Sequence, residues 1–132
     1  MNETLKQIEQ FHGHIGPYAV IGYRMGLIAK KKLGSNPFSK NAVVWTGTTP
    51  PISCIVDGIQ ISSGCTYGKG NIIVKNKGIA KAEFSNKDGK QFQIFLKPEI
   101  KNEIDTKVTE ENMIDYSEKM FDKSDEELFE II

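Results

Sequence analysis

Two histidines and two cysteines are the residues of this chain best suited to metal chemistry. They are the only ones of their kinds: the histidines stand together as His12-Gly13-His14, and Cys54 and Cys65 flank a short apolar segment. Two imidazoles and two thiolates form a tetrahedral zinc set by ligand type. Because an i, i+2 pair in extended backbone projects to one side, both rings can reach one ion. A zinc site is one hypothesis, and structural histidines with apolar, buried cysteines are the alternative.

The Gly-rich segment 64–71, GCTYGKGN, is a second candidate for chemistry. It is not a Walker A motif, because only three residues precede Gly-Lys and a glycine follows the lysine. Its glycines permit a nest of backbone N–H groups, and Lys69 adds a cation beside Thr66 and Tyr67, so a small anion is a possible ligand. The alternative is a tight turn that leads into a strand.

Two further roles depend on neighbouring side chains. Asp57 and Gln60 offer acceptors for the ring N–H groups of metal-bound histidines. Cys65, between Lys69 and a nearby His14, is a possible nucleophile with a lowered thiol pKa, but no acyl-transfer motif supports that hypothesis.

These residues lie between elements that the sequence predicts. A short helix ends near Gln10, and Pro17 begins a buried helix that Gly34 ends; in it Gly22 and Gly26 leave room for another backbone. A short helix is expected within 52–61 and strands at 42–48, 71–75, 79–85 and 90–97, with a hairpin at 86–89. Thr109 is expected to cap a helix and Ser124 a last short one. The fold class is α+β, an antiparallel sheet with helices mainly on one side.

Composition limits the kinds of function. The chain has 132 residues, enough for a single domain over 1–132, with 17 basic and 17 acidic side chains and no net charge. Zero net charge argues against a dedicated nucleic-acid binder. A polar start and the lack of a long apolar run predict a cytoplasmic protein with no membrane segment.

The zero charge conceals a division. Residues 105–132 carry ten acids and three lysines, a net charge of −7, and the body 1–104, which holds the motifs, is +7. One interpretation is a solvated acidic helical tail. The other is a tail that packs on the basic body or on a second copy by charge complementarity.

Two separate blocks of sequence resemble the FmdE family, named for the FmdE component of formylmethanofuran dehydrogenase. The first is FHGHIGP at 11–17 followed by IGYRMG at 21–26; the second is SCIVDGIQ at 53–60 followed by GCTYGKGN at 64–71. The order and spacing agree over roughly residues 8–97. The chain departs from the family pattern at Gly16, where members have cysteine, at Tyr18, where they have glycine, and in lacking the downstream zinc ribbon.

The resemblance implies an α+β domain, often a homodimer, with a metal, expected to be zinc, held by His14 and Cys54 first and by His12 and Cys65 next. Loss of the cysteine at position 16 predicts an open site. The leading hypothesis is a metal-binding accessory or small-ligand-binding protein. The alternatives are a small metal-dependent enzyme acting on a small anion, with Lys69, Asp57 or Tyr67 aiding proton transfer, and a metal-free dimeric interaction module.

Overall fold

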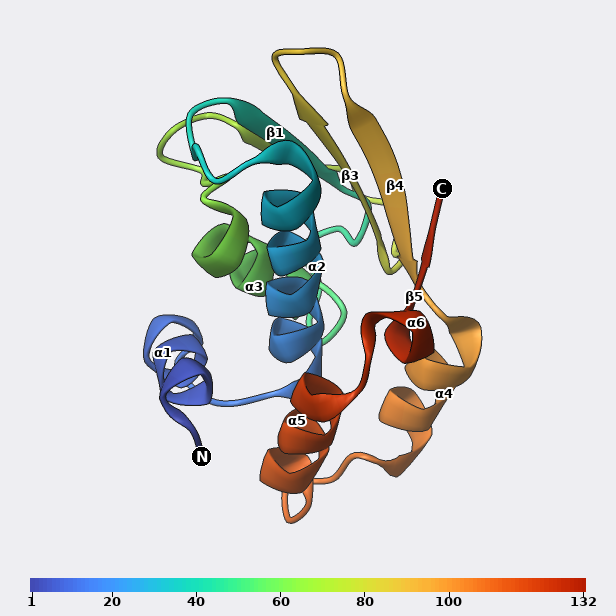
Figure 1. Cartoon of the computed structure of the whole chain (residues 1–132). Helices are drawn as coiled ribbons and strands as arrows, with labels where there is room; N and C mark the ends of the chain where they lie inside the picture. The colour runs from blue at the N-terminus through green and yellow to red at the C-terminus, as the bar shows by residue number, and fades with distance from the viewer.

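The computed structural model describes all residues 1–132 as an α+β fold, which confirms the expected class (Figure 1). Six helices and five strands follow one another along the chain as α1 (Glu3–His12), α2 (Pro17–Leu33), β1 (Lys40–Val44), α3 (Cys54–Ser63), β2 (Ile72–Val74), β3 (Lys81–Asn86), β4 (Gln91–Leu96), α4 (Pro98–Lys107), α5 (Met113–Asp122), α6 (Asp125–Leu128) and β5 (Phe129–Ile131).

The strands form one sheet in the order β2-β1-β3-β4-β5. All neighbours pair antiparallel except β1 and β2, which are parallel because the chain crosses through α3 between them. The predicted hairpin joins β3 and β4, where Asn86 accepts hydrogen bonds from the backbone of Asp88 and Lys90. Alternate residues of the central strands are buried on one face, among them Ala82, Phe84 and Ile94.

Helix α2 packs between that face and α3, and it is buried along most of its length. Its glycines allow the close approach that the sequence predicted: a Cβ at Gly22 would lie 2.0 Å from the carbonyl oxygen of Ile55. From the other helix, a Cβ at Gly58 would lie 2.0 Å from the carbonyl oxygen of Ala19. The two helix backbones are therefore in contact, and the first turn of α3 is fixed beside the first turn of α2.

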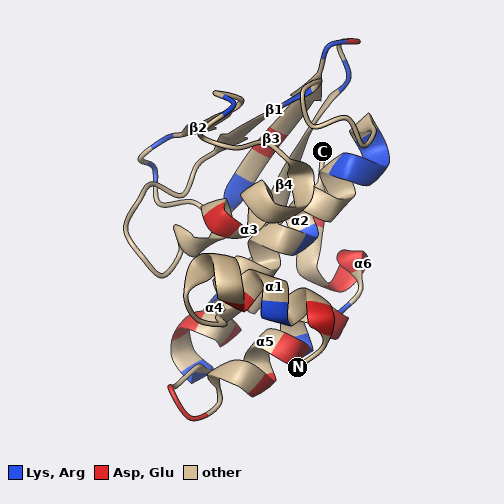
Figure 2. Cartoon of the chain, turned by 90° about the vertical axis from the view of Figure 1, so that its left-hand side faces the viewer, with Lys and Arg blue, Asp and Glu red and all other residues tan.

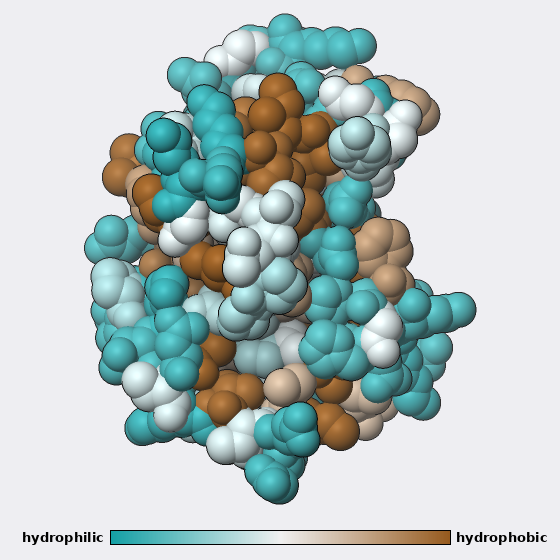
Figure 3. Space-filling view, turned by 180° about the vertical axis from the view of Figure 1, so that it is seen from behind, coloured by the Kyte–Doolittle hydropathy of each residue, from teal (hydrophilic) through white to brown (hydrophobic).

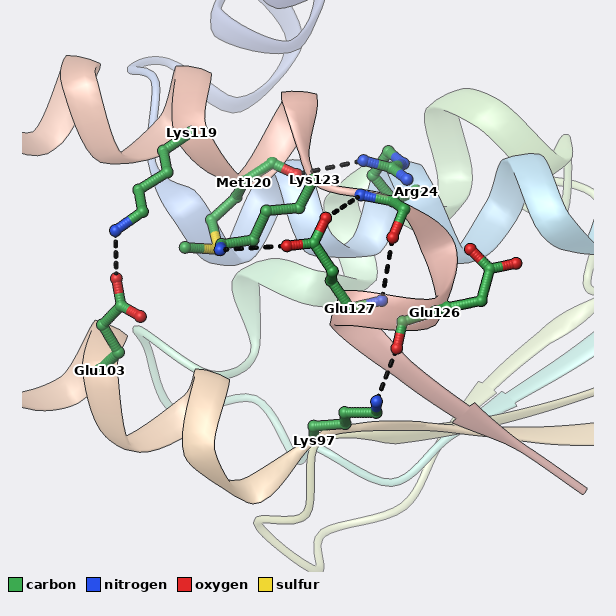
Figure 4. Close-up of polar contacts among 9 residues, drawn as sticks. Arg24, Lys97, Glu103, Lys119, Met120, Lys123, Glu126 and Glu127 are labelled. Carbon is green, nitrogen blue, oxygen red and sulfur yellow. Dashed lines mark hydrogen bonds and ion pairs between the residues drawn. The ribbon is translucent and has the colours of Figure 1, made fainter.

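The C-terminal segment packs on the body, so the interpretation as a free, solvated tail is wrong. Met120, Leu128 and Phe129 join the core, and α5 contacts α2. Arg24 of α2 donates to the carbonyl oxygen of Met120 at 3.2 Å (Figure 4). It also donates to the carbonyl oxygen of Phe121 at 2.7 Å and to the carboxylate of Asp125.

Three sequence expectations in this segment need correction. Thr109 does not cap a helix; it forms a turn in which the Asn112 side chain accepts from the Thr109 backbone N–H, and α5 begins after that turn, at Met113. Helix α4 and strand β5 were not expected. The Ser124 cap is confirmed, with a reciprocal capping box to Glu127.

Acidic and basic residues occupy different regions of the fold, as they do of the sequence. Figure 2 shows the acidic residues gathered on the helical part around α5 and α6, and lysines on the loops beside the sheet. The face of the sheet away from α2 has no helix over it and carries partly exposed apolar side chains (Figure 3), namely Val43, Trp45, Ile73, Phe95 and Ile132. None of the helices is long and apolar enough to cross a membrane.

Candidate functional site

The two histidines lie at the break between α1 and α2. His12 is the last residue of α1, and Gly13 ends the helix with a left-handed backbone angle of φ +96° that favours glycine. The ring centroids of His12 and His14 are 4.9 Å apart. The turn therefore brings both rings to one place, although not through the extended backbone that the sequence analysis assumed, because His12 is helical and Gly13 is left-handed.

His12 is oriented by a carboxylate on α3. Its Nδ1 lies 2.6 Å from Oδ2 of Asp57, and its side chain is only 10% exposed. The other ring nitrogen, Nε2, is buried and has no hydrogen-bond partner. With Nδ1–H donated to Asp57, Nε2 carries an available lone pair, the state in which histidine binds a metal.

Cys54 begins α3 and reaches the same region. It lines, together with His12, two adjoining cavities of about 230 and 250 Å³. Burial and, to a lesser extent, the charge of Asp57 raise the pKa of the Cys54 thiol above its usual value. In the metal-free protein this thiol is therefore protonated at neutral pH rather than an activated thiolate.

The 230 Å³ cavity is bounded by the starts of α2 and α3 and by the segment from α4 to α5. Half of its lining side chains are apolar, and the C-terminal segment supplies part of that wall. The lining residues are His12, His14, Gly16, Pro17, Tyr18, Ala19, Pro51, Cys54, Ile104, Asp105, Val108 and Met113.

A hydrogen-bonded chain that the sequence analysis missed lies on the side of α4. The Tyr18 hydroxyl donates to Oδ1 of Asp105 at 2.5 Å, and Lys101 donates to Oδ2 at 2.6 Å. Burial and the bond to Asp105 raise the pKa of Tyr18, so the phenol stays protonated. Burial opposes the ionised form of Asp105, but the bonds from Lys101 and Tyr18 outweigh it and lower its pKa. A tyrosine in the apolar first part of α2 is the only sequence signal, since a buried hydroxyl needs a partner.

The other candidate residues lie away from this cavity. Cys65 is fully buried in the core, and burial raises its thiol pKa, which does not fit a reactive nucleophile. Tyr67 is 87% exposed, and Lys69 donates to Thr66.

Gln60 serves the Gly-rich turn rather than a histidine, because its side-chain oxygen accepts from the backbone N–H of Tyr67. The structure thus separates the sequence candidates into two groups, with His12, His14, Cys54 and Asp57 in one and the Gly-rich turn in the other.

The first group suits zinc by chemistry. Histidine nitrogens and a cysteine thiolate are zinc donors, and the buried, unpaired Nε2 of His12 is the kind of atom that a ligand satisfies. As the side chains stand, however, no three of His, Cys, Asp and Glu converge closely enough to hold an ion. His14 is exposed and makes no hydrogen bond, so its side chain is able to rotate.

Comparisons with known proteins give a family model and a crystal structure of similar fold. A family model described as "FmdE, Molybdenum formylmethanofuran dehydrogenase operon" matches residues 11–130. A crystal structure of a tungsten formylmethanofuran dehydrogenase FmdE-like protein from Syntrophus aciditrophicus superposes with a TM-score of 0.69 over 98% of this chain and 69% of that one, at 23% identity.

A curated relative from Archaeoglobus fulgidus bears the name of a probable S-adenosyl-L-methionine-binding protein. It is 30% identical over 105 residues, which cover 75% of this chain but only 28% of the relative. With the family model matching nearly the whole length, the chain belongs to the FmdE family.

Proposed function

We propose that this chain is a metal-binding, FmdE-like accessory protein that takes zinc at His12, His14 and Cys54 and a small ligand in the adjoining cavity. The observation that carries the proposal is the His12 ring, which Asp57 orients while its buried Nε2 has no partner. A carboxylate on one ring nitrogen with the other nitrogen left for a metal is the usual arrangement around a zinc-bound histidine.

The donor set also bears on the role of the metal. Structural zinc sites have four protein ligands, whereas sites that act on small molecules keep a position open. Three donors line this cavity, and Gly16 provides none. When bound, zinc would act there as a Lewis acid. Cys65 is left out of the proposed ligand set because it is buried in the core.

Metal content of protein purified without chelator tests the proposal. We expect one zinc per chain, and we expect His12→Ala, His14→Ala and Cys54→Ser each to lower the affinity by about tenfold or more. Cys65→Ala is the matched control and should keep its zinc. Absence of stoichiometric metal, or full retention in Cys54→Ser, would overturn the proposal.

The hypothesis of a small anionic ligand relied on Lys69 as the cation. Lys69 does not line this cavity, because it lies on the Gly-rich turn. S-adenosylmethionine is a useful probe because of the name of the A. fulgidus relative, although this chain spans only 28% of that protein. Calorimetric titration of zinc-loaded protein with S-adenosylmethionine shows whether the shared part binds it.

We also propose that the chain forms a homodimer. The uncovered sheet face supports this, because Ile73 is 58% and Ile132 77% exposed on it or at its edge. Sedimentation equilibrium should give twice the chain mass, and Ile73→Lys should halve it. Ile114→Lys, on α5 and 49% exposed, is the control. A monomer at micromolar concentration contradicts the proposal.

A further inference from the structure

We infer that the cavity selects a small molecule that presents a hydrogen-bond donor or a positive charge toward Tyr18 and Asp105, and that it disfavours carboxylates there. This inference rests on the proposed role of the cavity as the ligand site and names the chemistry of that ligand. It does not depend on zinc, since the groups that carry it lie on α2 and α4 rather than among the proposed metal ligands.

Asp105 is the only carboxylate that lines the cavity, and no lysine or arginine lines it; the basic groups of the lining are the two histidines. Asp57 adds a second negative charge directly behind His12. The nearest cation, Lys101, is bonded to the Oδ2 atom of Asp105 but does not line the cavity. In the metal-free protein, an anion placed beside Asp105 would therefore meet a carboxylate without a lysine or arginine to pair with.

The hydrogen-bonding groups at Tyr18 and Asp105 are one-sided as well. The Tyr18 hydroxyl is already donated to Asp105, so what remains unpaired on these two residues is acceptor capacity, the free lone pairs of their oxygens. Acceptors without a free donor beside them favour a ligand that brings its own N–H or O–H groups to this end of the cavity.

The remaining wall fixes the shape of the ligand. Ile104, Val108 and Met113 contribute apolar side chains to the lining, together with Pro17 and Pro51. A ligand that fills about 230 Å³ thus combines a compact apolar body with a polar, donor-bearing end.

Three probes of equal length test the inference: n-butylammonium, n-butanol and butyrate, each titrated into the full chain and followed by ¹H–¹⁵N NMR. The titrations are run with chelator and again with zinc, while zinc content is measured separately. In the metal-free protein we expect n-butylammonium to shift the resonances of the cavity residues with an affinity at least fivefold above that of butyrate. The ratio is read from the metal-free titrations, because butyrate is also a ligand for bound zinc.

Two variants should move this preference in opposite directions. The Asp105→Asn side chain still accepts from Tyr18 but lacks the negative charge. The ratio of n-butylammonium affinity to butyrate affinity should therefore fall to about one. Lys101→Gln leaves the Asp105 charge without its ion pair, so the preference should rise. Asp115→Asn, an exposed acid on α5, is the matched control and should change nothing.

In the metal-free protein, butyrate binding as tightly as n-butylammonium in the cavity, or a preference that Asp105→Asn leaves unchanged, would overturn the inference. Zinc content is measured on separate samples purified without chelator, so either proposal can fail while the other holds. The failure of the ligand inference is thereby distinguished from the failure of the proposed metal function.

Discussion

Gly16 lies against the imidazole of His14 at the start of α2. A Cβ built at this position would be 3.4 Å from Nε2 of His14, an ordinary contact distance. The backbone there is extended, with φ −149° and ψ 151°, so any residue can adopt it. A side chain at position 16 would therefore point to the proposed metal donors without straining the chain.

Gly16→Cys should accordingly tighten zinc binding by about tenfold or more, because it adds a thiolate to a set of three donors. Gly16→Ser is the matched control, with the same Cβ but a poorer zinc ligand. Competition titration with a chromogenic chelator measures both. Equal affinities for Gly16→Cys and the wild type would show that position 16 does not face the metal.

Asp57 raises the thiol pKa of Cys54 by its negative charge, in addition to the larger effect of burial. Asp57→Asn removes that charge, so the pKa should fall and more thiolate should be present at any pH below it. The pH dependence of alkylation of the metal-free protein measures the midpoint. Cys54→Ser gives the background, since Cys65 is fully buried. A midpoint that rises, or does not move, contradicts this interpretation of the site.

At the scale of elements, the contact between α2 and α3 positions the site. Gly58→Ala would place a methyl carbon 2.0 Å from the Ala19 carbonyl, so the helices must separate. We expect a loss of about 3 kcal/mol and a fall in Tm of roughly 10 °C, together with weaker zinc binding, because Cys54 and Asp57 move with α3.

Gly68→Ala is the matched control for that substitution. Nothing lies within 4 Å of a Cβ at Gly68, and its φ is outside the left-handed region. Thermal unfolding should therefore change by less than about 1 kcal/mol. If Gly58→Ala unfolded at the same temperature as Gly68→Ala, the close packing of α2 on α3 would be contradicted.

The elements that could be predicted from sequence carry their own boundary signals. Pro17 and Gly34 delimit α2, and the strong turn at 86–89 fixes the hairpin of β3 and β4. Helix α4 has only Ile100 and Ile104 buried, too few for a clear amphipathic pattern. Strand β5 has three residues, and its pairing with β4 defines it more than its own composition does.

The candidate site, like the fold, has one part that local sequence predicts and another part that depends on packing. His12 and His14 are neighbours in sequence, and the short helix that carries Cys54 and Asp57 fits against them, so these residues could be proposed together. The bond between Tyr18 and Asp105 joins residues 87 positions apart. No local pattern indicates such a pair, because it depends on where α4 packs. Cys65 is the opposite case. It was a candidate donor by residue type, but it is buried in the core, and residue type alone cannot distinguish a core cysteine from a metal donor.

At the scale of the whole molecule, ionic contacts hold the acidic segment against the body, and they differ in strength. Figure 4 shows Lys119 of α5 paired with Glu103 of α4, and Arg24 directed at the end of α5. The Lys119 side chain is 50% exposed, and exposed pairs contribute little. Arg24 is 11% exposed and bonds backbone carbonyls as well as Asp125. The single arginine is therefore the main polar link between the two parts.

Arg24→Met keeps the apolar stem and removes the guanidinium, leaving the Met120 and Phe121 carbonyls without this donor and Asp125 without its ion pair. We expect a loss of about 2–4 kcal/mol, with faster amide exchange across residues 113–128 and a weaker ammonium preference in the cavity, whose wall includes Met113. Lys119→Met is the control and should stay within about 1 kcal/mol. Because the packing of α5 on α2 holds Met113 in the cavity wall, unchanged exchange in Arg24→Met would mean that the apolar contacts alone hold the segment.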